Sequence, residues 1–536
     1  MKNRIKQYLL AASMCVGLTA CSDFFEPIPG VQFGLDETFA SKQRTEEYLN
    51  NVYSYVREVT DAIHPNTYGG IFTEASLDGA NRWNKTYAEW TNGSFNSASA
   101  QASEYFSKYY QAIAKASTFI QNVDKCTEAA ASTRGKWKSE ARALRAYYYF
   151  ELLRLYGPIP LIGEDPIPLD ASLEELIKER NSVDECVNFI ATELQSAIDS
   201  GDLLQRAGKA NLGRMDVATC MALKAKLYLY WASPLFNGNT DQASVKNKDG
   251  KQLFPQTEDN SKWTQARDAY ERFMTFATGQ GYKLTEVYTN GKLDPYASCR
   301  AAGEFFTTTW EAVDELIFVK LRDLYDYTYW VCPKFTDFQD TDVTGGGGYY
   351  TTQETVDLFF TKDGLTIEED PGYDKFEGIP GANNFTSGRY YDPNNPSRLY
   401  FDADKSKVLK QWKDREPRFY VNITYSGSIW LNEGKYNEEM RTDFTNGANG
   451  TCGKSKASGD CPDSGYLIRR GAKASNNNGS KHFSPVLRLA DMYLGYAEAL
   501  CMCSDLDNAL TYLNKIRVRA GIPEYTFTAT AGKITC

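Results

Sequence analysis

Apolar residues recur at steps of three and four along several segments, the spacing that places them on one face of an α-helix. This pattern predicts helices from Lys138 to Tyr156, over residues 183–199 and over residues 216–232. The first helix should end at Gly157-Pro158, because proline cannot continue a helix. The three apolar stripes consist of Ala141, Leu144, Tyr148, Leu152 and Leu155; Val183, Val187, Ile190, Leu194 and Ala197; and Val217, Met221, Ala225, Tyr228 and Ala232.

A further pair of helices is predicted near the end of the chain, from Leu487 to Met502 and from Asp507 to Arg519. Repeats of helix pairs bury their apolar faces only by stacking on neighbours. The fold class is therefore predicted to be mostly α, with a tetratricopeptide-like helical-repeat scaffold. The spacing of the tetratricopeptide pattern, with its large residues replaced, is followed by Tyr493, Ala497, Leu500, Ala509 and Leu513.

Residues 236–485 separate this last pair from the earlier helices and lack sustained periodicity. The stretch is rich in Gly, Asn, Asp and aromatic residues, and it contains Gly345–Gly348 in a row. Only short strand-like runs occur, such as Leu316–Lys320 and Phe419–Thr424. We expect a large irregular insertion, with short strands and ligand-binding loops, on the helical scaffold, because loops of this length are usually functional.

The amino terminus has the features of a secretory signal, with Lys2, Arg4 and Lys6 ahead of an apolar run from Tyr8 to Leu18. This run is too short to span a membrane. It ends in Leu18-Thr-Ala-Cys21, which resembles the lipobox of bacterial lipoproteins. We expect cleavage before Cys21, lipid attachment to its thiol and anchoring to a membrane through that lipid. The alternative is an ordinary cleavage site followed by an accidental cysteine.

Composition narrows the classes of function. The chain has 536 residues with 69 acidic and 59 basic side chains, and its net charge of −10 disfavours nucleic acid as a partner. Because His64 and His482 are the two histidines, histidine-based metal sites and Ser/His/Asp triads are close to excluded. Aromatic residues make up 14% of the chain, which draws attention to aromatic clusters outside the periodic helices.

These patterns divide the chain into six parts. Residues 1–20 are the lipoprotein signal peptide, 21–40 a lipidated tether, 41–235 an N-terminal helical region, 236–485 the irregular insertion, 486–523 the last helix pair and 524–536 a tail. At the end of the last helix, Arg517 and Arg519 are interpreted as positive charges placed favourably at a helix C-terminus.

Several stretches together resemble the SusD/RagB family of outer-membrane lipoproteins, and they occur in that family's order. They are residues 137–150 (WKSEARALRAYYYF), 154–161 (RLYGPIPL), 222–234 (ALKAKLYLYWASP), 352–359 (TQETVDLF), 415–420 (REPRFY), 487–500 (LRLADMYLGYAEAL) and 513–523 (LNKIRVRAGIP).

The resemblance implies a lipid-anchored protein exposed at the cell surface, which captures oligosaccharide and passes it to a SusC-like TonB-dependent transporter in the outer membrane. In that family the chain continues beyond the last helix pair, whereas this sequence stops at Cys536. We therefore expect the tail to be truncated relative to the family and apolar surface to be exposed on the scaffold.

One candidate glycan-binding cluster lies between residues 78 and 95, where tryptophans alternate with amide and charged side chains. A flat ring covers the C–H face of a sugar, while Asn and Arg bond to its hydroxyl groups. The alternative is an amphipathic helix whose tryptophans lie in the core. The candidate residues are Asp78, Arg82, Trp83, Trp90 and Asn92.

A second candidate cluster lies near residues 325–335, with Trp310 upstream. Alternation would place Tyr325, Tyr327 and Tyr329 on one strand face, followed by Trp330. The alternative is a half-buried strand whose tyrosines pack on the scaffold. The resemblance favours the glycan-binding interpretation, because family members draw sugar-stacking residues from this part of the chain.

Two further features bear on chemistry, a candidate disulfide and a candidate calcium-binding loop. Cys452 and Cys461 flank a Gly/Ser/Lys loop and are candidates for a disulfide. Asp337, Asp340 and Asp342 could hold Ca²⁺, but a solvated loop is the preferred interpretation. No cofactor, metal or catalytic residue is expected. The alternatives to a glycan carrier are a surface glycoside hydrolase, a peptide-cargo binder, or a protein-interaction scaffold of the same fold.

Overall fold

The structure is a computed structural model. It describes residues 33–56, 76, 79–82, 93–165, 167, 171–303, 314–323, 329–335, 345–376, 378, 380–431, 441–444, 452–453, 459–472, 481–528 and 533–535.

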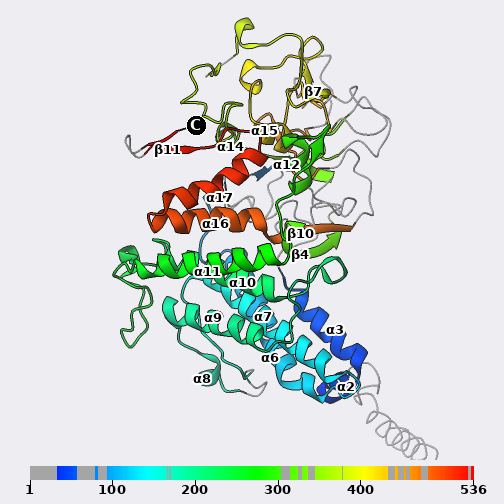
Figure 1. The fold of residues 1–536 in the computed structure, drawn as a ribbon. Helices are drawn as coiled ribbons and strands as arrows, with labels where there is room; N and C mark the ends of the chain where they lie inside the picture. Colours follow the sequence, from blue (N-terminus) through cyan, green and yellow to red (C-terminus); the bar gives the residue numbers. More distant parts are fainter. Residues whose placement is uncertain are drawn as a thin grey trace, which may run out of the picture.

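Long helices form a stacked scaffold in which each one packs on the next (Figure 1). The packing order runs from α6 through α7, α9, α10 and α11 to α16 and α17, so α16 lies beside α11 although about two hundred residues separate them. The helices are α2 (Leu35–Ala40), α3 (Lys42–Tyr53), α6 (Ala100–Asn122), α7 (Ala131–Tyr156), α8 (Leu173–Leu176), α9 (Val183–Asp199), α10 (Val217–Ala232), α11 (Ser261–Gly279), α16 (Leu489–Met502) and α17 (Leu506–Arg519).

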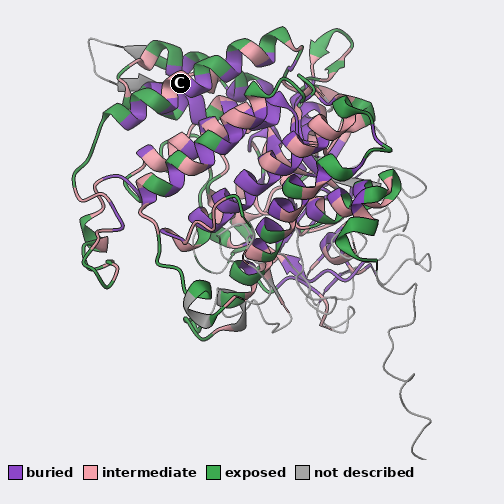
Figure 2. Cartoon of the chain, turned by 90° about the horizontal axis from the view of Figure 1, so that it is seen from below, coloured by how far each residue is buried: buried purple, intermediate pink, exposed green. Residues whose placement is uncertain are grey.

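The main hydrophobic core lies between these helices, and α7 contributes most of its length to it. Figure 2 shows buried residues on the inward faces of the helices and exposed residues on their outward faces. The predicted stripe of residues 183–199 faces this core, as does the stripe of α7 except for Leu155, which is 37% exposed. In the stripe of 216–232, Val217 and Ala225 belong to the core, whereas Met221 and Tyr228 are half-buried against it. The mostly α, helical-repeat fold class is therefore confirmed.

One buried ion pair crosses the layers of this scaffold. Arg145 of α7 is fully buried, and its Nε donates to Oε2 of Glu193 on α9 at 2.8 Å. Its Nη1 donates to Oγ of Ser117 on α6 at 3.0 Å. Because the guanidinium group reaches helices on both sides of α7, it fixes the order of three neighbouring layers.

A loop-rich region with short helices and small sheets lies at the end of the scaffold next to α17 (Figure 1). Its helices are α12 (Pro295–Gly303), α14 (Gln353–Asp357) and α15 (Pro417–Asn422). A four-stranded antiparallel sheet has the order β1 (Ala80–Asn81), β5 (Tyr349–Tyr350), β9 (Tyr466–Ile468) and β8 (Ile423–Tyr425).

The remaining strands pair two by two, and short 3₁₀ turns join several elements. The strand pairs are β2 (Tyr288–Thr289) with β3 (Lys292–Leu293), β4 (Leu316–Asp323) with β10 (Lys481–Arg488), β6 (Arg389–Asp392) with β7 (Asn395–Asp402), and β11 (Thr526–Thr528) with β12 (Lys533–Thr535). The 3₁₀ turns are η2 (Val123–Lys125), η3 (Lys209–Asn211), η4 (Thr240–Gln242), η6 (Ala382–Asn384) and η7 (Lys410–Trp412).

The helical scaffold extends further than the sequence patterns predict. Helix α11 lies inside residues 236–485, which were expected to be irregular, and it packs against α10 and α16. At the other end, α2 lies inside the expected tether, and Phe39 is fully buried. The predicted insertion and the predicted tether therefore each contain a helix that packs on the scaffold.

Two strand predictions also need correction. The run Leu316–Lys320 is confirmed as part of β4, but Phe419–Thr424 begins in helix α15 and becomes a strand only at Ile423. Tyr329, expected on a strand face, is helical, as is Trp330. Pro417 at the start of α15 has the fixed backbone angle that suits a first helical turn.

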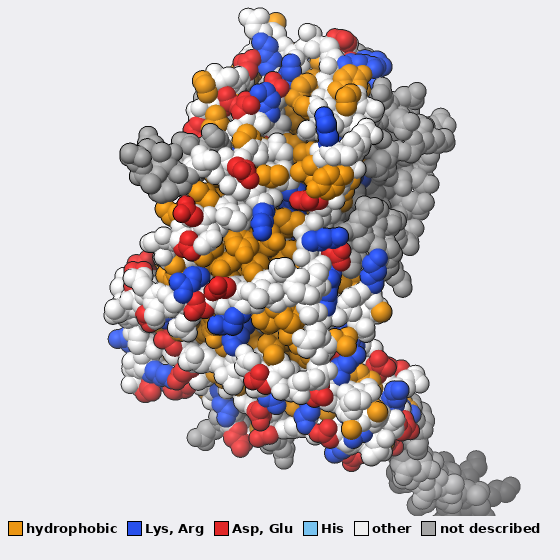
Figure 3. All heavy atoms as spheres, viewed as in Figure 1, with side chains coloured by type: hydrophobic (Ala, Val, Ile, Leu, Met, Phe, Trp, Pro, Cys, Tyr) orange, Lys and Arg blue, Asp and Glu red, His pale blue; other side chains and the backbone are white. Residues whose placement is uncertain are grey.

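Within the part of the chain that the structure describes, no helix has the length and apolarity to cross a membrane. Figure 3 shows charged side chains of both signs scattered over the face in view, between patches of hydrophobic side chains. Cys21 and the signal segment lie outside the described residues, so lipid anchoring stays a prediction.

Candidate functional site in the loop-rich region

The four-stranded sheet brings together segments of the two clusters that the sequence singled out. The backbone N–H of Arg82, directly after β1, donates to the carbonyl of Gly348 at 3.0 Å. The N–H of Gly348 donates in turn to the carbonyl of Trp330 at 3.2 Å. The glycine run 345–348 therefore joins the two clusters, although more than two hundred residues separate them in sequence.

Glycine is required in this run because the Trp330 ring lies against the backbone. A Cβ atom added at Gly346 would lie 2.2 Å from Cε3 of Trp330, and one at Gly345 would lie 2.4 Å from the carbonyl oxygen of Cys332. Trp330 is half-buried, meets Tyr329 edge to face at 4.8 Å, and packs against a small buried cluster that includes Trp430. Part of the Trp330 ring therefore belongs to the core.

Arg82 is held by protein groups in this structure. Its Nη1 donates to Oδ1 of Asp463 at 2.7 Å and to the carbonyl of Cys461 at 2.9 Å. Its side chain is 18% exposed and that of Asp463 is 51% exposed. The guanidinium group is thus fixed against the segment 461–463, which lies a few residues before β9 in sequence.

The other predicted glycan-binding residues lie outside the described residues, and their roles stay predictions. They are Asp78, Trp83, Trp90, Asn92, Trp310 and Tyr327. The aspartate loop 337–342 also lies outside the description.

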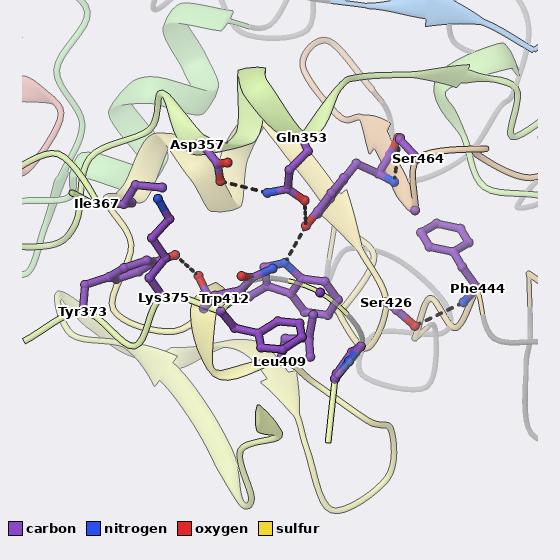
Figure 4. A pocket seen from close by; sticks show the side chains of 16 residues that line it. Gln353, Asp357, Ile367, Tyr373, Lys375, Leu409, Trp412, Ser426, Phe444 and Ser464 are labelled. Carbon is purple, nitrogen blue, oxygen red and sulfur yellow. Dashed lines mark hydrogen bonds between the residues drawn. The ribbon is translucent and has the colours of Figure 1, made fainter. Parts of the chain in front are cut away.

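A pocket of about 590 Å³ opens next to this junction (Figure 4). Its walls come from α14, the loop 367–380, the turn η7, the ends of β8 and β9, and Phe444. The volume lies within the range of small-molecule sites, roughly 300–1,000 Å³. The aromatic members of its lining are Tyr373, Phe376, Trp412, Phe444 and Tyr466.

A chain of hydrogen bonds fixes the polar side of this aromatic pocket (Figure 4). The indole Nε1 of Trp412 donates to the hydroxyl of Tyr466 at 3.1 Å, and that hydroxyl donates to Oε1 of Gln353 at 2.9 Å. Nε2 of Gln353 then donates to Oδ1 of Asp357 at 2.8 Å, one helical turn further along α14. Because each donor has a defined acceptor, the amide and the carboxylate are oriented before any ligand arrives.

Burial shapes the chemistry of the two pocket tyrosines. Burial raises the pKa of Tyr466 above its ordinary value. It also raises the pKa of Tyr373 to about 12, although the nearby Arg415 guanidinium opposes the shift. Both hydroxyl groups therefore stay protonated near neutral pH and keep their capacity to donate.

Arg415 is a buried side chain that holds two walls of this pocket together. It is 3% exposed, and its Nη1 donates to the Tyr373 hydroxyl at 2.7 Å. Its Nη2 donates to the carbonyls of Val356 and Phe359, at 2.6 and 2.7 Å, which lie at the end of α14. One guanidinium group thus connects the helix that carries Gln353 and Asp357 with the loop that carries Tyr373.

The rings that face the pocket differ in exposure. Trp412 and Tyr466 are 7% and 4% exposed, whereas Tyr373, Phe376 and Phe444 are half-buried. Phe444 packs against the same buried cluster as Trp330, and Ser464 of the pocket directly follows Asp463, the partner of Arg82. The aromatic pocket and the junction of the two predicted clusters are therefore neighbouring parts of one surface region.

The sequence analysis did not assign the pocket residues to a site. Two stretches that carried the family resemblance, residues 352–359 and 415–420, contain α14 and Arg415 and lie at the pocket wall. The two family stretches were therefore the sequence signal that could have indicated this pocket. The pocket itself combines several segments of the loop-rich region, and no local pattern shows which of them meet.

The candidate disulfide is not formed in the structure, where Cys452 and Cys461 are both buried thiols. Cys452 belongs to the buried cluster next to Trp330, whereas Sγ of Cys461 accepts a contact from Nη1 of Arg82 at 3.7 Å. The two sulfurs therefore have different surroundings. Among the described residues, no group of three or more His, Cys, Asp or Glu is placed to hold a metal ion.

A stacked helical scaffold that carries a preformed polar and aromatic pocket on a loop-rich region defines a class of binding proteins. Two family models match this chain, the SusD family over residues 315–534 and the family described as "Starch-binding associating with outer membrane" over residues 32–229. The chain belongs to the SusD/RagB family.

Individual relatives agree with this assignment. A SusD-like protein from Bacteroides ovatus is 27% identical over 175 residues, a match that spans 31% of this chain and 30% of that relative. The crystal structure of a SusD-like protein from Bacteroides fragilis has a TM-score of 0.66 at 21% identity and covers 93% of this chain and 84% of its own. A SusD-like carbohydrate-binding protein from the same organism has a TM-score of 0.60 at 18% identity, with 92% and 82% covered.

Proposed function

We propose that this protein is a surface lipoprotein of the outer membrane that captures oligosaccharide and passes it to a SusC-like TonB-dependent transporter. The observation that carries the proposal is the aromatic pocket, with its oriented Gln353 and Asp357, in a chain whose family is described as starch-binding and associated with the outer membrane. Cys21 is the proposed lipid attachment site.

The pocket has the two kinds of surface that a sugar needs. The half-buried rings of Tyr373, Phe376 and Phe444 can cover the C–H face of a pyranose, and each covered face contributes about 1 kcal/mol. The amide of Gln353 and the carboxylate of Asp357 can bond to hydroxyl groups, at about 1 kcal/mol for each bond. After the loss of freedom on association, such contacts support micromolar to millimolar affinity, about −4 to −8 kcal/mol.

Binding without hydrolysis fits this lining better than catalysis. Glycoside hydrolysis uses two carboxylates roughly 5–10 Å apart. Asp357 is the one carboxylate among the described residues that line the aromatic pocket. The proposal therefore assigns the pocket to recognition and gives no residue a catalytic role.

The sequence-predicted clusters form a second part of the proposed glycan surface. Arg82, Tyr329 and Trp330 lie beside the aromatic pocket in this proposal, and the remaining members complete the surface. Those members are Asp78, Trp83, Trp90, Asn92, Trp310 and Tyr327.

Calorimetric titration of the soluble form lacking residues 1–21 tests the proposal. The probes are an α-1,4-linked glucan oligosaccharide, a β-1,3-linked glucan oligosaccharide and a mixed panel of other neutral glycans. Phe376→Ala should lower the affinity for the bound glycan about tenfold, or about 1.4 kcal/mol, without a large change in melting temperature. Tyr288→Ala is the matched control, because Tyr288 is 60% exposed and lies outside the pocket.

The same titration separates the two parts of the glycan surface. Trp330→Ala should also reduce affinity about tenfold if its exposed edge contacts sugar, whereas a purely structural Trp330 would cost melting temperature and leave affinity unchanged. The proposal is wrong if no glycan of the panel binds at millimolar concentration. If Phe376→Ala leaves the glycan affinity unchanged, the aromatic pocket is not part of the glycan-binding surface.

A further inference from the structure

A second cavity lies on the opposite face of α14, and its chemistry differs from that of the aromatic pocket. Its volume is about 380 Å³. Thr355 of α14 and Leu358, which directly follows the helix, line one side, and Leu358 is 70% exposed. The cationic part of the lining consists of Arg418, Arg470, Arg488 and Arg519, and we call the cavity the arginine cavity.

Two buried carboxylates accompany the four guanidinium groups. Nη1 of Arg519 donates to both oxygens of Glu315 at 2.9 Å, and Nη1 of Arg488 donates to Oε1 of the same carboxylate at 3.2 Å. Glu416 lines the cavity and accepts from Nε of Arg418. One carboxylate, that of Glu315, is therefore shared by two guanidinium groups, so it does not match their positive charges one to one.

Arg488 shows how closely the positive charges are gathered. It is the N-cap residue of α16, where the helix dipole already favours negative charge. Burial and the nearby Arg470 lower the pKa of Arg488 to about 10. A carboxylate shared with Arg519 thus offsets only part of the positive field at this position.

We propose that the arginine cavity binds a compact oxyanion, a sulfate, phosphate or carboxylate group, either as a free ion or as a substituent on a sugar. Planar guanidinium forks match the paired oxygens of these groups and form the stronger, charge-assisted hydrogen bonds. The amide of Asn422 also lines the cavity and adds a neutral polar group beside the arginines. The cavity volume is at the small end of ligand sites, which suits one anionic group or one acidic sugar ring.

This proposal is independent of the proposed glycan function, because the lining of the arginine cavity and that of the aromatic pocket share no described residue. An acidic sugar would connect the two functions, and a free inorganic ion would not. The probes are therefore chosen so that the two sources give different results.

The test is calorimetric titration of the soluble form lacking residues 1–21 with sodium sulfate, sodium phosphate, sodium glucuronate and neutral glucose, at constant ionic strength. At least one of the three anions should bind saturably, and glucose should not compete with it. Arg470→Gln should weaken that binding at least about tenfold, the effect of losing a charged hydrogen-bond donor. Arg272→Gln is the matched control, because Arg272 is exposed on α11 and removes the same charge outside the cavity.

Leu358→Glu provides a second variant that does not depend on a buried arginine. It places a negative charge at the exposed edge of the cavity and should also weaken anion binding at least about tenfold, with the melting temperature unchanged. Preference for glucuronate would identify an acidic sugar as the ligand, and binding of sulfate or phosphate alone would identify a free ion. The proposal is overturned if none of the three anions binds saturably, or if Arg470→Gln, Leu358→Glu and Arg272→Gln all bind like the wild type.

Discussion

The aromatic pocket and the arginine cavity lie on opposite faces of one helix of five residues, yet their linings have opposite character. Gln353 and Asp357 of α14, four positions apart, face the aromatic pocket. Thr355 and Leu358, three positions apart, face the arginine cavity. Residues three or four apart share one face of a helix, so even a single short helix can separate two binding environments.

The adjacent residues Arg415 and Glu416 also serve different cavities. Arg415 donates to Tyr373 of the aromatic pocket, whereas Glu416 lines the arginine cavity and accepts from the N–H of Phe360 at 2.9 Å. The stretch 415–420, which resembles a family motif, therefore supports both cavities and contacts the end of α14 between them. The comparison teaches that one recognisable stretch can supply both buried supporting groups, such as Arg415, and groups that line a cavity, such as Arg418.

Arg415→Ala should have the largest effect on stability, because Arg415 bonds both to the end of α14 and to the loop that carries Tyr373. The substitution removes donors to the carbonyls of Val356 and Phe359 and to the Tyr373 hydroxyl, and it leaves these groups unsatisfied in a buried site. We expect a loss of about 4 kcal/mol of stability, since hydrogen bonds to charged groups contribute about 1.5–3 kcal/mol each. Chemical denaturation measures it, with Arg415→Lys expected to lose about half as much. An effect as small as that of Arg272→Ala on exposed α11 would show that Arg415 supports neither cavity.

Glu315→Gln should affect only the arginine cavity, with a loss of about 2 kcal/mol at neutral pH. Removal of one partner of a buried ion pair costs about 3–5 kcal/mol, and the remaining amide oxygen of glutamine recovers part of it. The substitution also raises the net positive charge of the cavity, so sulfate binding should become tighter while glycan binding stays unchanged. Glycan affinity that changes in parallel with sulfate affinity would mean that the two cavities are not independent.

The same variant gives a pH dependence of known sign. Burial raises the pKa of Glu315, but Arg519, Arg488 and the N–H of Thr285 lower it by more, so the folded pKa lies below the ordinary value. The stabilisation by Glu315 is therefore complete above the ordinary glutamate pKa of about 4.3 and is lost as the pH falls through the lower folded value. Thermal unfolding from pH 7 to pH 3 should show a difference between wild type and Glu315→Gln that shrinks only below about pH 4. A constant difference across this range would contradict the assignment.

Tyr466→Phe should have the smallest effect and should be confined to the aromatic pocket. It removes the hydroxyl that accepts from Trp412 and donates to Gln353, at a cost of about 1 kcal/mol. Gln353 then loses one of the two bonds that orient it, and glycan affinity should fall about threefold to tenfold. Calorimetry with glycan and with sulfate checks this result, with exposed Tyr288→Phe as the control. Equal losses for both ligands would count against separate sites.

The sequence predicted the helical scaffold well because its signals are local. The stripe of residues 183–199 matches α9 at both ends, where the Ser182 side chain accepts from the N–H of Glu185 to cap the first turn. Helix α11 was missed although Trp263, Ala266, Tyr270, Phe273 and Ala277 follow the same spacing and are buried. This helical spacing lies inside a stretch whose overall composition, rich in Gly, Asn and Asp, is typical of irregular structure.

Arg517 and Arg519 show the limit of local interpretation. From the sequence they were favourable charges at a helix end, but both are less than 7% exposed and bind distant segments. Arg519 pairs with Glu315, and Arg517 donates to the carbonyl of Gly364 at 3.0 Å and lies over the Tyr525 ring. A helix position predicts the local field around a charge, but it carries no information about a partner some two hundred residues away.

The sequence by itself determined the family resemblance and several scaffold helices, among them α7, α9 and α10, because these depend on residue types and on spacings of a few residues. Only the tertiary structure decided that residues 80–82, 329–330 and 345–348 meet in one sheet region and that α14 separates an aromatic pocket from a cavity of arginines. Such sites depend on which loops close upon one another, and loop closure is set by the whole packed scaffold, whereas periodicity is set within each segment.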